Sequence, residues 1–493
     1  MRTIFRQIVA ILLCGSLAFL PIAGDARQAQ VSSAQAAQQA SLRDYLQKSY
    51  VELFDLAPKL TFSDQQIKDQ RDALDQGKDM CVTRFKNHAK DYGKQIDAEQ
   101  KNLKAKTAKL GDADRKATHC RIQNLDLLKS EAQMLSAQAI PTAYDNLSAK
   151  LDILQKWPAQ YKLVQQQIAD ESYMQRRWAD VKDIGFREIA ANQQDDIKRG
   201  QQAVEELKRT GLMPPEMDNK QIRDYVNTIA QKIARKSDLK VPLHITVLQS
   251  REINAFALPG GYLFINRGLL EAVDNESELA GVIAHEISHD VARHSNKLMN
   301  RATIASIFYQ AAQIAAIILT GGAAGIALSY ALQYGFYGLG LVIDLKLLGI
   351  SRDYELEADQ LGVQYAWNAG YDPAGFIDFF DKMATHEGYV NSVSWFRTHP
   401  AFYDRMVATE KEIMFLPPKA AAIVQTTEFE EMKKELAPVT IKAEKEEVER
   451  PSLLITREEG CAPPRKLEYK PGQPIEQICA APAVTLSEVT PAK

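Results

Sequence analysis

The residues best suited to chemistry lie in one short run, His285-Glu286-Ile287-Ser288-His289. On a helix, two histidines four residues apart project from the same face, so both imidazole rings can reach a single metal ion about 2 Å away. Glu286 follows the first histidine, where its carboxylate could take a proton from a water molecule as that water attacks a peptide carbonyl. The spacing therefore predicts a metal centre with His285 and His289 as ligands and Glu286 as the general base.

A helix must position this group. Asn275 and Glu278 have the spacing of a capping box, which predicts a helix from Ser277 to about His294. His294 follows His289 by five residues, and at about 100° per residue it would lie about 140° further around that helix. We therefore expect His294 to face away from the metal and to have a structural or polar-surface role.

A third ligand is expected further along the chain. Glu355 and Asp359 are four residues apart on a second expected helix, which ends near Gly370. One carboxylate can bind the metal, while the other, one turn away, can accept the free ring N–H of a ligand histidine. Glu357 should face elsewhere, in solvent or in a salt bridge.

Two β-rich segments precede the histidine pair. Residues 243–247 alternate in polarity, and residues 254–261 lead through Pro259 and two glycines into a second strand at 262–265. Proline and paired glycine confine this segment to an edge or a turn. An edge strand could receive an extended peptide by strand addition, and we expect peptide to bind along the strand after Gly261. An ordinary hairpin explains the pattern as well. The candidate substrate-binding residues are Asn254, Ala255, Phe256, Gly261 and Tyr262.

These motifs together resemble one known family. The run 274–280, the His285–His289 motif, Glu355-x-x-Ala358-Asp359 and the segment 254–261 occur in the order found in the zinc metallopeptidases that include the CAAX prenyl protease, HtpX and BepA. The chain is similar to the soluble periplasmic branch of that family over about residues 184–416. The resemblance implies an α+β fold of the zincin (gluzincin) type, mostly helical with a small sheet, and one Zn²⁺ per chain. It also implies Glu355 as the third zinc ligand and Asp359 as a partner of the ligand shell.

The same resemblance extends to Thr398-His399-Pro400 and to Arg405. It implies that His399 is either a fourth ligand that keeps the enzyme latent or a stabiliser of the transition state, whereas a histidine before a proline is by itself more typical of a turn. The implied activity is hydrolysis of peptide bonds in misfolded or misassembled envelope proteins. The alternatives are a latent protease that acts mainly as a chaperone or assembly factor for outer-membrane proteins, and a membrane-embedded protease. The outer-membrane assembly machinery is a partner by analogy only.

The remainder of the 493-residue chain carries localisation signals rather than chemistry. Residues 1–26 combine basic Arg2 and Arg6 with an apolar run and small residues at 24 and 26, which predicts a signal peptide and a location in the periplasm of a Gram-negative bacterium. Residues 27–183 are expected to form an all-helical domain, 184–416 the metallopeptidase domain, and 417–493 a charged and proline-rich tail. A net charge of -3 gives no indication of nucleic-acid binding.

Four cysteines remain after the signal peptide: Cys81, Cys120, Cys461 and Cys479. An even number in an exported chain favours disulfides, and the locally closest pairs are Cys81–Cys120 and Cys461–Cys479. A zinc site made of the four cysteines is the alternative, but the C-x-x-C spacing of such sites is missing.

The segment 302–343 contains no charged residue, so its length alone would allow membrane spans. However, Thr303, Ser306, Gln310 and Gln313 recur at helical spacing and form a polar stripe. Such a stripe favours an amphipathic helix on a membrane surface or against the domain. A transmembrane hairpin is the alternative.

Overall fold

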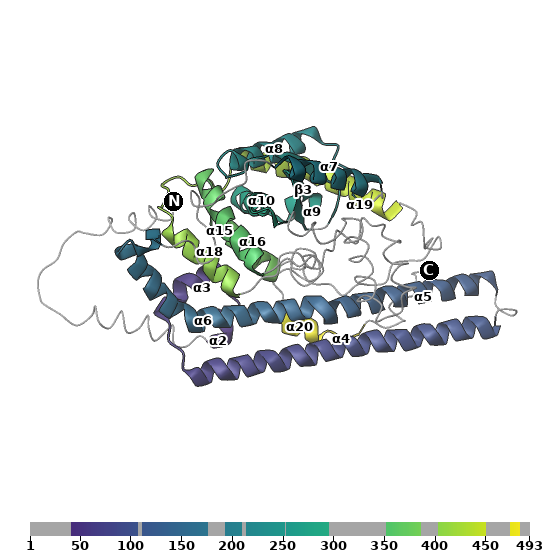
Figure 1. Ribbon diagram of the computed structural model, residues 1–493. Helices are drawn as coiled ribbons and strands as arrows, with labels where there is room; N and C mark the ends of the chain where they lie inside the picture. Colours follow the sequence, from purple (N-terminus) through teal and green to yellow (C-terminus); the bar gives the residue numbers. More distant parts are fainter. Residues whose placement is uncertain are drawn as a thin grey trace, which may run out of the picture. The chain divides into compact units, whose positions relative to one another are not determined.

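The structure is a computed structural model that describes residues 41–106, 111–175, 193–209, 213–251, 253–294, 352–385, 403–449 and 474–483 (Figure 1). Residues 1–47 and 48–493 are two separate units, and the described part of the first contains the short helix α2 (Leu42–Tyr45). The expected signal peptide, the segment 302–343, His399 and Cys461 lie outside the described residues. Among the described residues, no helix is both long enough and apolar enough to cross a membrane.

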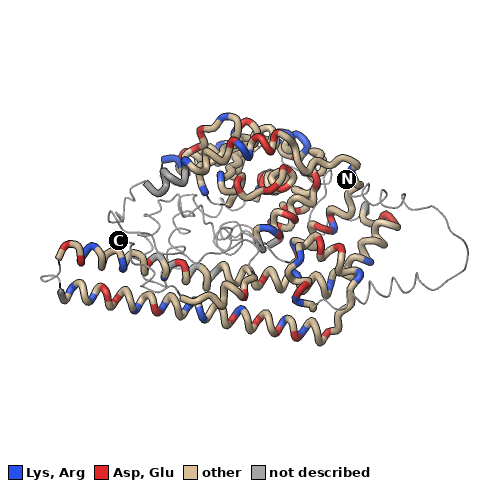
Figure 2. Tube along the Cα trace, turned by 180° about the vertical axis from the view of Figure 1, so that it is seen from behind, with Lys and Arg blue, Asp and Glu red and all other residues tan. Residues whose placement is uncertain are grey.

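The first part of the second unit is helical, as predicted. The elements are α3 (Tyr50–Leu56), η1 (Ala57–Lys59), α4 (Asp64–Lys106), α5 (Asp112–Met134), the π-helical turn η2 (Leu135–Ala139), α6 (Ile140–Ala169), η3 (Ser172–Gln175) and α7 (Gln194–Arg209). α5, η2 and α6 run back along α4, whose buried side chains Ile67, Leu74, Phe85, Tyr92 and Ile96 recur at helical spacing. Acidic and basic residues occur repeatedly along α4 and along α5 (Figure 2).

One disulfide joins the two ends of this unit. Cys81 on α4 is bonded to Cys479 on α20 (Ile475–Ala480), with the two Cα atoms 5.1 Å apart. The predicted pairs Cys81–Cys120 and Cys461–Cys479 are therefore both wrong. Cys120 is also disulfide-bonded, and its partner lies outside the described residues.

The rigidity of the helical hairpin explains why the local pairing fails. Arg121 on α5 pairs with Glu99 on α4, which sets the register of the antiparallel helices. Cys120 is then opposite a residue about 19 positions from Cys81, or roughly 28 Å along the helix axis. A disulfide requires Cα atoms within about 7 Å. Proximity in sequence is therefore no guide to pairing between two straight helices.

The strands of the next domain follow α7 and α8 (Lys220–Ala234) along the chain. Within the described residues its sheet has the order β1-β3-β2, formed by β1 (His244–Leu248), β2 (Ala255–Leu258) and β3 (Tyr262–Asn266). β3 pairs in parallel with β1 and antiparallel with β2. Gly260 and Gly261 form the tight turn between β2 and β3 with φ of 83° and 89°, which other residues rarely adopt. The expected edge position is correct for β2 but wrong for β3, which pairs with a strand on each side. The expectation that peptide adds to the strand after Gly261 is therefore wrong, because that strand is central.

Helix α10 (Glu276–Val291) lies at the centre of this domain, and all of its residues are buried. α8, α15 (Arg352–Asn368), α16 (Gly375–Thr385) and strand β2 pack around it (Figure 1). Gly362 permits the close approach of α15, because a Cβ atom there would lie only 3.0 Å from the backbone N and Cα of His285. The packing therefore brings the start of α15 beside the histidine pair. The predicted fold class, a mostly helical α+β domain with a small sheet, is confirmed.

The remaining helices fasten this domain to its neighbours. α18 (Tyr403–Phe415) packs on both α15 and α6, and α19 (Thr427–Glu449) packs on α8 and α9 (Arg267–Ala272). On α19, the Lys433 ammonium donates hydrogen bonds to the backbone carbonyls of Leu270, Glu271 and Val273 at the end of α9. The first half of the expected tail is therefore part of the packed body.

Candidate metal centre

Asn275 caps the central helix as expected, although the return bond of a full capping box goes to Asp274 and not to Asn275. The Asn275 side chain accepts a hydrogen bond from the backbone N–H of Glu278 at 3.0 Å, and the Glu278 carboxylate accepts one from the backbone N–H of Asp274 at 2.9 Å. The helix ends at Val291, three residues before the expected end at His294. This early end changes the position of His294, as described below.

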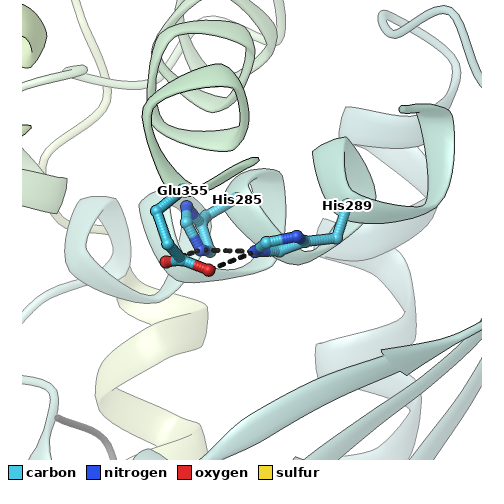
Figure 3. A group of neighbouring side chains, drawn as sticks. All are labelled: His285, His289 and Glu355. Carbon is cyan, nitrogen blue, oxygen red and sulfur yellow. Dashed lines mark hydrogen bonds and ion pairs between the residues drawn. The ribbon is translucent and has the colours of Figure 1, made fainter. Parts of the chain in front are cut away.

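Three buried side chains converge on one point between α10 and α15 (Figure 3). Nε2 of His285 is 3.0 Å from Nε2 of His289. The carboxylate of Glu355 lies 3.6 Å from the first of these nitrogens and 3.4 Å from the second. One ligand atom from each residue lies within 4.8 Å of the others. This arrangement brings together the three predicted metal ligands.

A buried ion pair supports the His285 side of the group. Nδ1 of His285 is 2.9 Å from Oδ1 of Asp359. Arg405 on α18 donates to both oxygens of Asp359 at 2.6 and 2.7 Å, and it also lies 3.1 Å from Glu355. Burial lowers the pKa of Arg405, but Asp359 and Glu355 outweigh burial and hold that pKa above its ordinary value. Arg405 is therefore a fixed positive charge behind the two carboxylates.

A second set of contacts supports His289, and sequence reasoning missed it. Nδ1 of His289 is 2.9 Å from Nδ1 of His294, and Nε2 of His294 is 3.1 Å from the Glu357 carboxylate. The His294 ring is 1% exposed and stacks on Tyr354 with ring centroids 4.3 Å apart. His294 is not part of the group that can bind metal, as expected, but its ring contacts His289 instead of facing away from the site. Glu357, expected in solvent or in a salt bridge, lies against the ring of His294.

The chain leaves the helical path between His289 and His294. Arg293 has φ of 57°, a left-handed conformation that is uncommon for a residue other than glycine. Its guanidinium donates to both oxygens of Asp196 on α7, at 2.6 and 2.8 Å, and these hydrogen bonds raise the pKa of Arg293. Continued helical geometry would have placed His294 elsewhere. The sequence did not indicate this helix end, because a left-handed residue after a helix is usually glycine, and here it is arginine.

The other expected site residues have different surroundings. Glu286 is buried on α10 beside the ligand histidines. Asn254 precedes β2, whose first residues are Ala255 and Phe256 and which packs against α10. Gly261 and Tyr262 belong to the turn and the central strand. The backbone N–H of Gly260 donates to Asp290 at 3.2 Å, and burial raises the pKa of Asp290 to about 7. The β2–β3 turn is thus bonded directly to the helix that carries the histidines.

The donor set is suited to a particular kind of ion. Two imidazole nitrogens and one carboxylate oxygen, all buried and within reach of one point, are the ligands that Zn²⁺ prefers at sites that keep one position open. A helix with His-Glu-x-x-His and an acidic ligand from a second helix define a metallopeptidase domain of the zincin class.

Comparison with known proteins finds similarity to a family of peptidases. Residues 217–413 match the model of peptidase family M48. It is 28% identical over 214 residues to the beta-barrel assembly-enhancing protease of Yersinia pestis, covering 43% of each chain. It is 30% identical over 208 residues to the putative beta-barrel assembly-enhancing protease of Vibrio cholerae, covering 41% of this chain and 42% of the relative. It is 33% identical over 192 residues to the mitochondrial metalloendopeptidase OMA1 of Schizosaccharomyces pombe, covering 38% and 52%. The matched region thus spans about half the length of these relatives, or less.

Proposed function

We propose that the chain is a zinc-dependent metalloendopeptidase that cleaves unfolded or misassembled proteins of the cell envelope. The convergence of His285, His289 and Glu355, with Glu286 on the same helix as the two histidines, carries the proposal. A zinc ion held by these three residues would supply Lewis acidity, which polarises a peptide carbonyl and makes water more acidic.

Three residues of the chain have the remaining roles in the proposed reaction. Glu286 takes the proton of the attacking water and passes it to the leaving amine nitrogen, so that one carboxylate acts first as base and then as acid. Oδ1 of Asp359 lies 2.9 Å from Nδ1 of His285, where the carboxylate favours the proton on Nδ1 and leaves Nε2 as the lone-pair donor. Arg405 contacts both Asp359 and Glu355 and thereby aligns the two carboxylates.

We place the extended substrate along β2. β2 is an edge strand among the described strands and packs against the helix that carries the histidines. An extended peptide added antiparallel to it at Asn254, Ala255 and Phe256 would bring a peptide carbonyl to the metal centre. Gly261 and Tyr262 would act indirectly, by holding the turn and the central strand on which β2 is formed.

The envelope location rests on independent support. Disulfides such as Cys81–Cys479 form and persist in oxidising compartments, and the first 26 residues have the pattern of a secretory signal. Two of the relatives are described as beta-barrel assembly-enhancing proteases. A role in outer-membrane assembly, with His399 as a latch on the active site, is the second candidate function.

The test compares the purified chain with Glu286→Gln, both loaded with zinc, in the cleavage of an unfolded protein. The variant should bind one zinc per chain and lose at least about 100-fold in rate, which is the usual contribution of a general base. Glu430→Gln, which changes an exposed carboxyl on α19, should cleave like the unmodified chain. Retention of activity in Glu286→Gln would contradict the assigned base. If neither chain cleaves although zinc is bound, the assembly role is favoured, and His399→Ala should then release activity.

A further inference from the structure

The two ligand histidines are supported in different ways. His285 contacts the carboxylate of Asp359 directly, whereas His289 contacts a second histidine that in turn contacts a carboxylate. We propose that His294 is a positioning residue for the metal centre, which together with Glu357 holds His289 in the orientation and tautomer that bind metal. This inference rests on the proposed zinc site and concerns the affinity of that site for its metal.

The position of each proton follows from the geometry. Nε2 of His289 faces His285 and Glu355, so a metal bound there uses the Nε2 lone pair and leaves the proton on Nδ1. That N–H points to Nδ1 of His294 at 2.9 Å, which must be unprotonated to accept it. His294 therefore carries its proton on Nε2 and donates it to the Glu357 carboxylate at 3.1 Å. Every donor along this path meets an acceptor, with His294 neutral.

The surrounding structure fixes the His294 ring in place. One face stacks on Tyr354, with the ring planes 13° apart. The backbone just before it is held in a left-handed conformation at Arg293, whose two hydrogen bonds to Asp196 tie this helix end to α7. A residue held in such a conformation requires compensating contacts around it. The fold thus keeps this ring against His289 at some conformational cost.

Two other roles for His294 are less consistent with the contacts. Direct ligation does not fit, because His294 meets the Nδ1 edge of His289, on the side opposite the atoms that converge with Glu355. A purely structural role would need only the stacking on Tyr354, and any planar ring would then serve. The hydrogen-bonded path from His289 to Glu357 predicts instead that the ring nitrogens matter.

The experiment measures zinc affinity of the full chain by competition with a chromophoric chelator, in parallel with the thermal unfolding of the metal-free protein. His294→Phe keeps a ring on Tyr354 but removes both nitrogens, and it should weaken zinc binding by about 10- to 100-fold while the metal-free chain unfolds near its usual temperature. His294→Asn replaces the Nδ1 acceptor by an amide oxygen and should recover most of the affinity. Glu357→Gln should weaken binding by about 3- to 10-fold, whereas Asp353→Asn, an exposed residue on the same helix, should have no effect.

The inference is overturned if His294→Phe binds zinc as tightly as the unmodified chain, or if His294→Asn is no better than His294→Phe. If His294→Phe does not fold, the zinc affinity of Glu357→Gln is compared with that of Asp353→Asn. Equal affinities of these two variants would overturn the inference. The absorption spectrum of the Co²⁺-substituted chain provides a second readout, since a reoriented His289 alters the ligand field. Neither measurement requires proteolysis. If the unmodified chain is an active protease and the variants bind zinc as tightly as it does, only the positioning role is refuted. If the variants bind zinc more weakly but the unmodified chain does not cleave protein, only the proposed activity is refuted.

Discussion

Replacement of Arg405 by methionine tests the electrostatic arrangement behind the metal centre. Arg405 is fully buried on α18, where it donates two hydrogen bonds to Asp359 and lies 3.1 Å from Glu355. Methionine is flexible and fills irregular space. The substitution therefore removes the positive charge without opening a large cavity.

The expected magnitude follows from the two carboxylates that lose their partner. Removing one member of a buried ion pair costs about 3–5 kcal/mol, because the other member keeps its charge without compensation. The guanidinium serves both Asp359 and Glu355, so the free energy of unfolding of the metal-free chain should fall by about 4–5 kcal/mol. Bound zinc would supply positive charge beside Glu355, so the loss should be smaller in the zinc-loaded chain.

Urea denaturation of the metal-free and zinc-loaded proteins measures this difference. The matched control is Arg223→Met, since Arg223 pairs with Glu216 at the surface, where the side chains are 38% and 50% exposed. Its loss should stay below about 1 kcal/mol. A loss below about 2 kcal/mol for Arg405→Met, or an equal loss with and without zinc, would refute the reasoning.

Two further predictions concern the helices outside the site. Burial, followed by the charges of Asp55 and Asp378, raises the pKa of Glu410 from 4.5 to about 7. The folded state therefore binds this proton more tightly than the unfolded chain, and stability should fall as the pH rises from about 4.5 through 7. Glu410→Gln should be more stable than the unmodified chain by about 1–2 kcal/mol at pH 8 and differ little at pH 4.5, as measured by urea denaturation; equal differences at both values would contradict the assignment. Cys81→Ser and Cys479→Ser should each lower the free energy of unfolding by about 2–5 kcal/mol, with the double variant no worse than either. Non-reducing peptide mapping should recover the two cysteines in one linked product, and linkage of Cys81 to any other cysteine would contradict the structure.

The parts of the site that could be predicted are those that local geometry controls. Two histidines four residues apart share a helix face whatever the rest of the chain does, so the type of chemistry followed from His285 and His289 directly. The helix cap at Asn275 likewise depends on neighbours in sequence. The prediction of Glu355 as a ligand required more information, because Glu355 is on a separate helix. Spacing alone left open which of two carboxylates would bind the metal. The resemblance to a known family implied Glu355, and the structure brings it to the two histidines.

The expectations that failed depended on contacts between distant segments. His294 was expected to continue a helix, but the pair between Arg293 and Asp196 of another helix accompanies a departure from the helical path that brings it to His289. β3 was expected near an edge, yet only pairing with β1 decides which strand is central. In both cases the sequence pattern predicted the helix or strand correctly, but it predicted the wrong position for the residue or strand in the folded domain.

The cysteines show the same division. Their even number predicted disulfides, and composition was sufficient for that conclusion. The choice of partner depended on how rigid helices lie against each other, because a straight hairpin keeps Cys81 and Cys120 far apart while the C-terminal segment brings Cys479 to α4. The sequence by itself thus determined the helices, the metal-binding residue types and the class of chemistry, all of which follow from periods of a few residues. Only the tertiary structure decided strand order, disulfide pairing and the support of His289. These features depend on packing between segments that are far apart in the sequence, and a short sequence repeat says nothing about such packing.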